Sequence, residues 1–455
     1  MRNFRLKKLK AVLTAFFLIL TLGVTDTLSH EVNKSAMVLL AAKDRSGKMF
    51  SNGTGFVVKP EGILITNYHV LVDAASMDAI FPDGSRVPVE GILKIDRIKD
   101  FAVLKLKEGF YSTLELGDSG GIRDFDYASA LGYSSHNVIN SGGRLKGIIV
   151  QTYGFVLGIH PQAYPDFPYI YTTAPFGPGF SGGPVVGKDN KVVGIATVEG
   201  RSINLALPIN EIKPFLDGKH QMTLAQLFEK DRDSKEAKYY RGNYALYAEG
   251  NPDRAIRFFR EVLAMDPNFV LAYYDLAVAH REKGRISESN ADYEKVVEIN
   301  PNFPEALSNL GGYYFREGKI EKAVELFKKA LKIYPNFIQA HSNLGAALNK
   351  LNRPGEALPH LKKTLLLDPE FAIAYYNLGN TRFALGQVEE AQKAYNQAVR
   401  LGVDFLTLHW KLFETNFQQG KSREAERQLR IILKIDPQNP KARKKLAELF
   451  SPPHP

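Results

Sequence analysis

Cysteine is absent from this chain of 455 residues. Its absence excludes disulfide bonds and thiolate metal sites, so a secreted form of the protein would depend on its hydrophobic cores for stability. The sequence also predicts no other metal site and no cofactor. Hydrophobic residues make up 44% of the chain, which is enough for two domains at this length.

The apolar run near the N-terminus, residues 11–24, is too short to cross a membrane comfortably. Five basic residues precede it: Arg2, Arg5, Lys7, Lys8 and Lys10. A basic segment followed by a short apolar run is typical of a signal peptide, although the small-residue cleavage rule is met only weakly at residues 27–29. Residues 1–29 therefore predict export to the periplasm or the extracellular space, with a membrane contact only if this segment is retained as an anchor.

The chain has little excess charge once these residues are set aside. Removing residues 1–29 takes away five basic residues and one acidic residue and lowers the formal net charge from +10 to +6. No dense stripe of Lys and Arg with interleaved aromatic residues is found, so the sequence predicts no nucleic-acid partner.

Residues 30–222 contain short apolar or alternating runs separated by Gly, Asp and Pro. They lie at residues 37–41, 55–58, 63–66, 102–106, 147–151 and 192–196. This spacing predicts an all-β domain. Residues 223–235, rich in charged side chains, are expected to form a linker or a short docking helix.

A serine stands among four glycines in residues 177–184, where turns closed to other residues become possible. Such turns allow the backbone N–H groups of Gly179 and Ser181 to point at one spot and form an oxyanion hole. A serine nucleophile needs a histidine base and an acid that orients it. His69, after the run at 63–66, and Asp100, before the run at 102–106, are the candidates, with Asp96 as the alternative acid.

The order histidine, aspartate, serine argues against an α/β-hydrolase, in which the acid and the histidine follow the serine. Five blocks, at residues 53–58, 64–70, 100–104, 116–119 and 179–184, resemble the HtrA/Deg branch of trypsin-like serine peptidases. The resemblance implies a chymotrypsin-like double β-barrel, with His69 and Asp100 from the first barrel and Ser181 from the second. Unlike some members of that branch, this chain has only a short segment at residues 43–51 and no PDZ-like stretch after the peptidase.

The resemblance also bears on activation and specificity. Phe180 stands where zymogen-type relatives carry an aspartate, so activation by clipping of the N-terminus is not expected. Pro175 and Phe176 stand where trypsin-type enzymes place the aspartate that pairs with Lys or Arg. An apolar substrate pocket is therefore expected, with walls at residues 197–200 and 204–207 that include Thr197 and Val198.

The second half of the chain repeats itself. Prolines recur at intervals of 34 residues or a multiple of 34: Pro267, Pro301, Pro335, Pro369 and Pro437. That period is typical of tetratricopeptide (TPR) repeats. In register with it, Gly250, Gly284, Gly318, Asn352, Gly386 and Gly420 are predicted at turns between helices. Six repeats are expected over residues 236–439 as an all-α superhelix with a concave face, followed by a capping helix and tail at 440–455.

TPR arrays usually bind proteins, so a protein partner is implied. Aromatic residues such as Tyr240, Phe315 and Trp410 are expected in the groove or in the stacking core. Asn309, Asn343 and Asn377 occupy one position in three successive repeats, where their amides either bond the backbone of an extended peptide or merely solvate the helices.

The sequence thus predicts a multidomain protein: an exported serine endopeptidase that cleaves protein substrates, with a TPR domain that recruits substrate or partner. The alternative is a catalytically inactive peptidase-fold scaffold that acts through its TPR repeats.

Overall fold

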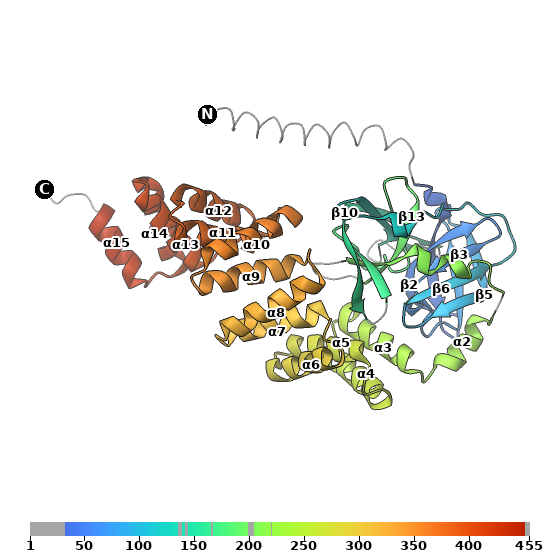
Figure 1. The fold of residues 1–455 in the computed structure, drawn as a ribbon. Coiled ribbons are helices and arrows are strands. Elements are labelled where there is room, and N and C mark those ends of the chain that lie inside the picture. Colours follow the sequence, from blue (N-terminus) through green and yellow to red (C-terminus); the bar gives the residue numbers. More distant parts are fainter. Residues whose placement is uncertain are drawn as a thin grey trace. The chain divides into compact units, whose positions relative to one another are not determined.

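The computed structural model describes residues 32–450 except 135–138, 142, 143, 165, 166, 199–203 and 220. The predicted signal segment therefore lies outside the described residues. The chain divides into two compact units, one up to Arg285 and one from Ile286 onward. The expected fold class is confirmed: two closed six-stranded β-barrels are followed by TPR helices (Figure 1).

The first barrel has the strand order β1-β2-β3-β6-β5-β4, and all six neighbouring pairs are antiparallel. The hydrophobic residues of these strands fill the interior of the closed barrel: the first six residues of β1 and all four of β3 are buried. The strands are β1 (Met37–Lys43), β2 (Met49–Lys59), β3 (Ile63–Thr66), β4 (Ser76–Ile80), β5 (Arg86–Asp96) and β6 (Phe101–Leu106).

The second barrel has the order β10-β11-β14-β13-β12-β7. Its core includes Ile170, Phe176, Phe180 and Val185. A separate two-stranded sheet pairs β8 (Ile139–Ser141) with β9 (Arg144–Lys146). The barrel strands are β7 (Tyr127–Tyr133), β10 (Ile149–Tyr164), β11 (Phe167–Thr172), β12 (Pro184–Val186), β13 (Val192–Val198) and β14 (Asn204–Pro208).

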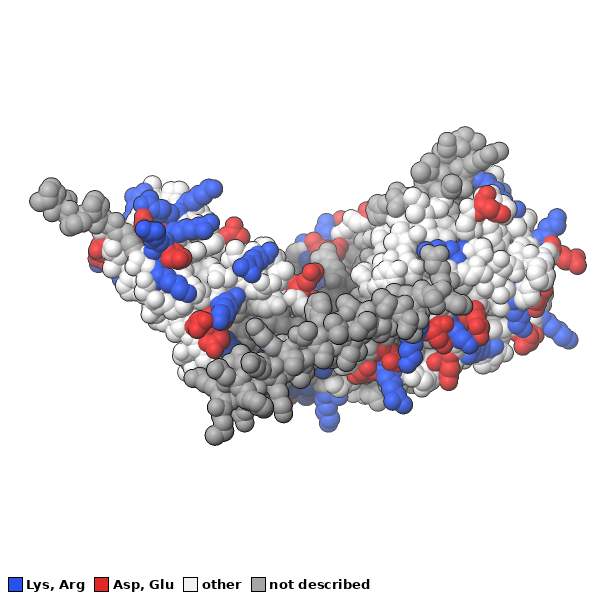
Figure 2. Space-filling view, turned by 90° about the horizontal axis from the view of Figure 1, so that it is seen from above, with Lys and Arg blue, Asp and Glu red and all other residues white. Residues whose placement is uncertain are grey.

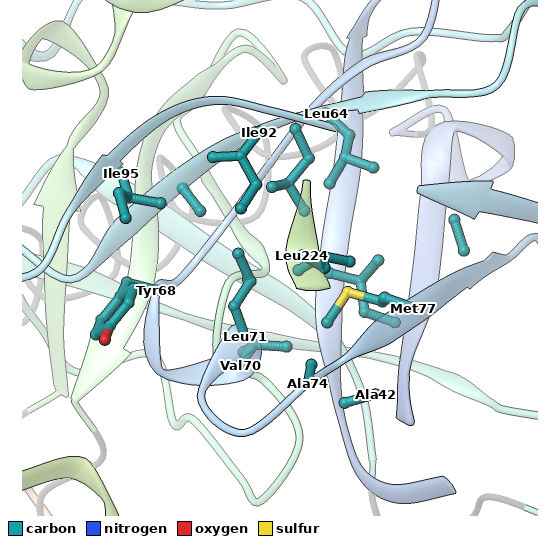
Figure 3. Packing of buried hydrophobic residues seen from close by; sticks show 14 of the residues in the cluster. Ala42, Leu64, Tyr68, Val70, Leu71, Ala74, Met77, Ile92, Ile95 and Leu224 are labelled. Atoms are coloured by element: carbon teal, nitrogen blue, oxygen red, sulfur yellow. The ribbon is translucent and has the colours of Figure 1, made fainter. Parts of the chain in front are cut away.

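After the second barrel the chain returns to the first. The Ile92 N–H donates to the Met222 carbonyl at 2.9 Å, which adds one bridge beside β5. Helix α2 (Leu224–Asp231) then starts at Thr223 with a capping box, in which Thr223 and Gln226 bond each other's backbone N–H groups. Leu224 and Leu227 are buried in the core of the first barrel, where Leu224 lies among barrel residues in Figure 3. The segment expected as a linker or docking helix is thus a helix packed on that barrel.

The first unit also contains the start of the helical part. Helix α3 (Lys235–Asn243) continues into a π-helical turn (Tyr244–Ala248) and is followed by α4 (Pro252–Met265) and α5 (Val270–Glu282). Buried Asp275 of α5 accepts hydrogen bonds from Tyr239, Asn243 and Tyr247 at 2.6–2.8 Å. Three donors on one buried carboxylate join the first helix of this array to the third.

The second unit consists of helices at the predicted period. They are α6 (Ile286–Ile299), α7 (Pro304–Arg316), α8 (Ile320–Ile333), α9 (Ile338–Lys350), α10 (Pro354–Leu367), α11 (Ala372–Ala384), α12 (Val388–Arg400), α13 (Leu406–Gln418), α14 (Ser422–Ile435) and α15 (Pro440–Phe450). In α14 the buried residues Ala425, Leu429 and Ile432 recur at helical spacing and form its apolar stripe.

The predicted turn residues are confirmed. Gly250, Gly284, Gly318, Gly386 and Gly420 each follow a helix with φ between 60° and 77°, and Asn352 has φ 55°. This left-handed conformation ends a helix at little cost only for Gly and, less well, Asn.

A second series of glycines, not predicted from the sequence, lies inside the helices. Gly311, Gly345 and Gly379 stand 34 residues apart, and Gly242 precedes Gly311 by 69 residues; a Cβ at each would lie within 2.3–2.6 Å of a large side chain of the following helix. These glycines allow Phe259, Phe327, Leu361 and Tyr395 to pack directly on the backbone.

The described surface carries both signs of charge. Figure 2 shows Lys and Arg side chains interspersed with Asp and Glu side chains on the face in view. Within the described residues, none of the helices is both long enough and apolar enough to span a bilayer.

Candidate active site

His69 lies at the start of a short 3₁₀ turn, His69–Leu71, shortly after the buried strand β3. Its Nδ1 lies 2.7 Å from Oδ2 of Asp100, and its backbone N–H donates to Oδ1 of the same carboxylate at 2.9 Å. The Asp100 side chain is 6% exposed and that of His69 is 27% exposed. The carboxylate is therefore enclosed and fixes the imidazole, while the ring keeps access to the surface.

The backbone around Asp100 is constrained. Asp100 has φ 60°, a conformation that few residues other than glycine adopt and that Asp and Asn tolerate best. Its carbonyl accepts a hydrogen bond of 2.6 Å from the buried amide of Asn67. Asp96, the alternative acid, accepts the N–H groups of Ile98 and Lys99 at 3.0 and 2.9 Å and so caps the preceding turn. The contact with His69 is made by Asp100.

Ser181 lies in a turn held by backbone hydrogen bonds. Phe180 N–H donates to Gly177 at 2.9 Å, and Gly183 N–H donates to Phe180 at 2.7 Å. The Ser181 carbonyl accepts the N–H of Thr54, on β2 of the first barrel, at 2.9 Å. The turn is therefore attached to both barrels.

Gly182 shows how closely this turn approaches the histidine segment. A Cβ on Gly182 would lie 2.3 Å from the Thr54 carbonyl and from Thr66 Oγ1, and 2.9 Å from the Asn67 nitrogen. With φ 82°, this position is restricted to glycine by conformation as well as by space. The Ser181 turn thus lies against the backbone just before His69. No hydrogen bond joins Ser181 Oγ to His69 in the described structure, and such bonds often tighten only when substrate is bound.

The backbone N–H groups of Gly179 and Ser181 donate no hydrogen bond to any described residue. The Gly179 carbonyl is instead fixed by Thr54, whose hydroxyl donates to it at 2.6 Å and accepts the Tyr133 N–H at 2.9 Å. Thr54 lies in the block at residues 53–58, but no role for it was predicted from the sequence. Thr54 is buried, and its bonds to the carbonyls of Gly179 and Ser181 make it the support of the Ser181 turn.

The predicted pocket residues differ in how far they are buried. Pro175 is exposed, and its carbonyl accepts the Thr152 hydroxyl at 2.7 Å. Phe176 is buried in the core of the second barrel. Thr197 is buried and accepts the Asn67 amide at 3.3 Å. The side chain of Val198 and residues 199–203 lie outside the described residues, so the apolar pocket stays a prediction.

The asparagines predicted to bind peptide lie at matching positions of three helices in the second unit. Asn309 is on α7, Asn343 on α9 and Asn377 on α11, and all three side chains are partly exposed. Among the described residues, no group of His, Asp and Glu side chains is arranged to hold a metal ion.

The fold and this geometry define the class of the first part, a trypsin-like peptidase domain. The model of the family described as "Trypsin-like peptidase domain" matches residues 53–195. Models described as "Tetratricopeptide repeat" match residues 223–268, 246–308, 292–325 and 348–412, and one described as "TPR repeat" matches residues 311–352.

Over the same part of the chain, the sequence is similar to curated serine proteases named HTRA and DegP-like. The chain is 33% identical over 177 residues to "Serine protease HTRA1" of Xenopus tropicalis, covering 37% of this chain and 36% of that protein. It is 34% identical over 171 residues to "Serine protease HTRA2, mitochondrial" of Bos taurus, covering 36% of each. It is 29% identical over 204 residues to "Probable periplasmic serine endoprotease DegP-like" of Rickettsia conorii, covering 42% of this chain and 39% of that protein. The chain thus spans little more than a third of the length of these relatives.

Proposed function

We propose that this protein is an exported serine endopeptidase that cleaves protein substrates, with Ser181 as nucleophile, His69 as base and Asp100 as orienting acid. The observation that carries the proposal is the pair of hydrogen bonds between Asp100 and His69, at 2.7 and 2.9 Å, beside the Ser181 turn. These bonds hold Nδ1 on the carboxylate and leave Nε2 as the proton acceptor.

The reaction would proceed in two steps. Ser181 Oγ attacks the scissile carbonyl and its proton passes to His69 Nε2, while the N–H groups of Gly179 and Ser181 stabilise the oxyanion. The C–N bond breaks, and the leaving amine takes the proton from His69. Water, deprotonated by His69, then attacks the acyl ester; the C–O bond to Ser181 breaks, Ser181 Oγ takes the proton back from His69, and the product acid is released.

Export rests on two observations. The N-terminal segment has the pattern of a signal peptide, and a relative 29% identical to this chain carries "periplasmic" in its name. An exported peptidase without cysteine fits that compartment, because neither barrel needs a disulfide for its core.

The TPR part would recruit a protein substrate or partner. Asn309, Asn343 and Asn377 place three amides at one position of three successive repeats, on α7, α9 and α11, and an amide side chain carries both donor and acceptor atoms for an extended backbone. Such a ladder would hold a polypeptide with little regard to its sequence.

Labelling with a serine-directed fluorophosphonate tests the peptidase, using protein without residues 1–29. We expect wild type to be labelled and to degrade unfolded casein, and Ser181→Ala to do neither while keeping its thermal midpoint. The variant removes only a hydroxyl, so folding should survive. If wild type is folded but as unreactive as Ser181→Ala, the peptidase proposal fails and the inactive scaffold takes its place.

A further inference from the structure

Helix α3, the first helix after the peptidase domain, directs three consecutive side chains to three different surroundings. Tyr239 packs into the helical array, with its ring 5.2 Å from that of Phe269. Tyr240 lies on His69 of the peptidase. Arg241 pairs with Asp73, four residues after His69. Two of the three therefore reach the segment that carries the candidate base.

Tyr240 covers one side of the His69 imidazole. The ring centroids are 5.7 Å apart with an interplanar angle of 28°, and the Tyr240 ring also meets Tyr68 edge-on at 5.6 Å. Its hydroxyl donates to the Arg97 carbonyl at 3.2 Å. Burial, and after it the negative charge of Asp100, raises the pKa of Tyr240 well above its ordinary value, so this hydroxyl stays a donor.

The segment that carries His69 is attached to the same helices on both sides. Tyr68 donates its hydroxyl to buried Asp231 of α2 at 2.5 Å. On the other side, the guanidinium of Arg241 donates to both oxygens of Asp73, at 2.7 and 3.0 Å. A bidentate contact of this kind fixes the relative orientation of the two side chains as well as their distance.

The loop that carries Asp100 is also attached to helices α2 and α3. Arg97 donates to both oxygens of Asp231, at 2.6 and 3.1 Å, while its carbonyl accepts the Tyr240 hydroxyl. Burial alone would lower the pKa of Arg97, but the hydrogen bond and charge of Asp231 offset burial and raise it. Arg97 therefore remains a cation beside a buried carboxylate.

These contacts all come from residues 231–241, so one short segment holds the positions of both His69 and Asp100. We propose that Tyr240 is a positioning residue for His69, and that the peptidase site is completed by the first helix of the TPR part. The inference rests on the proposed function, because it concerns the geometry of the His69–Asp100 pair. Loss of the Tyr240 ring frees one face of the imidazole, and misorientation of a catalytic group costs rate far more than it costs substrate binding.

Steady-state kinetics on a short chromogenic peptide, with full-length wild type and variants, tests the proposal. We expect Tyr240→Ala to lower kcat about 10- to 100-fold with little change in KM, and to slow fluorophosphonate labelling in parallel. Tyr240→Phe keeps the ring and should recover most of the lost activity. Tyr239→Phe is the control for the stability of α3, because it removes the same hydroxyl from the neighbouring residue, where that hydroxyl bonds Asp275 of α5 and not the His69 segment.

Each result separates this proposal from the one on which it rests. An inactive wild type would remove the proposed function itself, before any Tyr240 variant is compared. An active wild type with Tyr240→Ala at an unchanged kcat would overturn the positioning role alone. A rise in kcat/KM for Tyr240→Ala would also overturn it, because Tyr240 would then obstruct the cleft. Equal losses in Tyr239→Phe and Tyr240→Phe would assign the effect to the stability of α3.

Discussion

Asp100 combines two demands at a single residue. It must present a carboxylate to His69, and its backbone must adopt φ 60° at the entry to β6. Asp and Asn are the side-chain-bearing residues best suited to that conformation, so replacing Asp100 by Asn changes the chemistry without adding backbone strain. The residue therefore offers a test of the triad that leaves the fold in place.

We expect Asp100→Asn to lower kcat on a chromogenic peptide by roughly a thousandfold to ten-thousandfold. The amide can donate to Nδ1 and so favours the tautomer in which Nε2 carries the proton and cannot act as base. The thermal midpoint of the Asp100→Asn variant should stay within a few degrees of that of wild type. Asp96→Asn is the control, since its Oδ1 can still cap the turn at Ile98 and Lys99. A larger loss of activity in Asp96→Asn than in Asp100→Asn would make Asp96 the catalytic acid.

Among the helices, α9 carries a buried titratable group outside the peptidase. His341 is 8% exposed, with Nδ1 at 2.9 Å from Nδ1 of His360 and Nε2 at 2.8 Å from the Pro335 carbonyl. Burial lowers the pKa of His341 to about 4; the hydrogen bond to Pro335 opposes this, and the charges of His360 and Lys363 add to it. Burial also lowers the pKa of His360, on the facing helix α10.

The second unit should therefore lose stability in mild acid. The unfolded chain protonates His341 near pH 6.5 and the folded chain near pH 4, so the unfolded state binds more protons between these values. Stability is fully present above about pH 6.5 and falls as the pH drops, by about 2 kcal/mol from this group at pH 5. Urea unfolding followed by circular dichroism at pH 7.5 and pH 5.0 would measure this loss of stability. Between the two pH values, the free energy of unfolding should fall less for His341→Gln than for wild type. An equal fall in both proteins would contradict the assignment of this pH dependence to His341.

At the scale of the whole molecule, a trypsin-like peptidase domain and TPR repeats share one chain. If the TPR repeats hold one segment of a substrate while another reaches Ser181, the local substrate concentration at the site rises toward the millimolar range for a short linker. Long substrates gain from this tethering, whereas short peptides do not.

Joint replacement of Asn309, Asn343 and Asn377 by alanine should therefore raise the apparent KM for a protein substrate and leave cleavage of a chromogenic peptide unchanged. All three side chains are partly exposed, so the helices should still fold. The comparison is made on casein and on the peptide in parallel. Equal losses on both substrates would indicate misfolding, and no loss on either would exclude the asparagine ladder from recruitment.

The sequence by itself was enough to predict what local pattern and repetition encode. Alternating apolar runs predicted an all-β domain, and the resemblance to HtrA/Deg peptidases implied its two barrels. The 34-residue period predicted the helices with their turns at Gly250 through Gly420. The pairing of His69 with Asp100 could be predicted because each follows or opens a strand and matches a known block. The second glycine series, at Gly311 and Gly345, has the same 34-residue period, so the sequence could also have predicted close helix packing at these positions.

Only the tertiary structure decided how the helical part meets the peptidase. Arg241 and Asp73 are 168 residues apart, and Tyr68 and Asp231 are 163 apart. Tyr68 lies in the block at residues 64–70 and Arg241 in the first repeat, but neither pattern indicates the partner of its side chain, so the local sequence does not predict these pairs. Tyr240, expected in the groove or in the stacking core of the TPR array, lies on His69 instead. Contacts of this kind depend on where two separately patterned parts pack together, and packing between distant surfaces leaves no periodic signal in the chain.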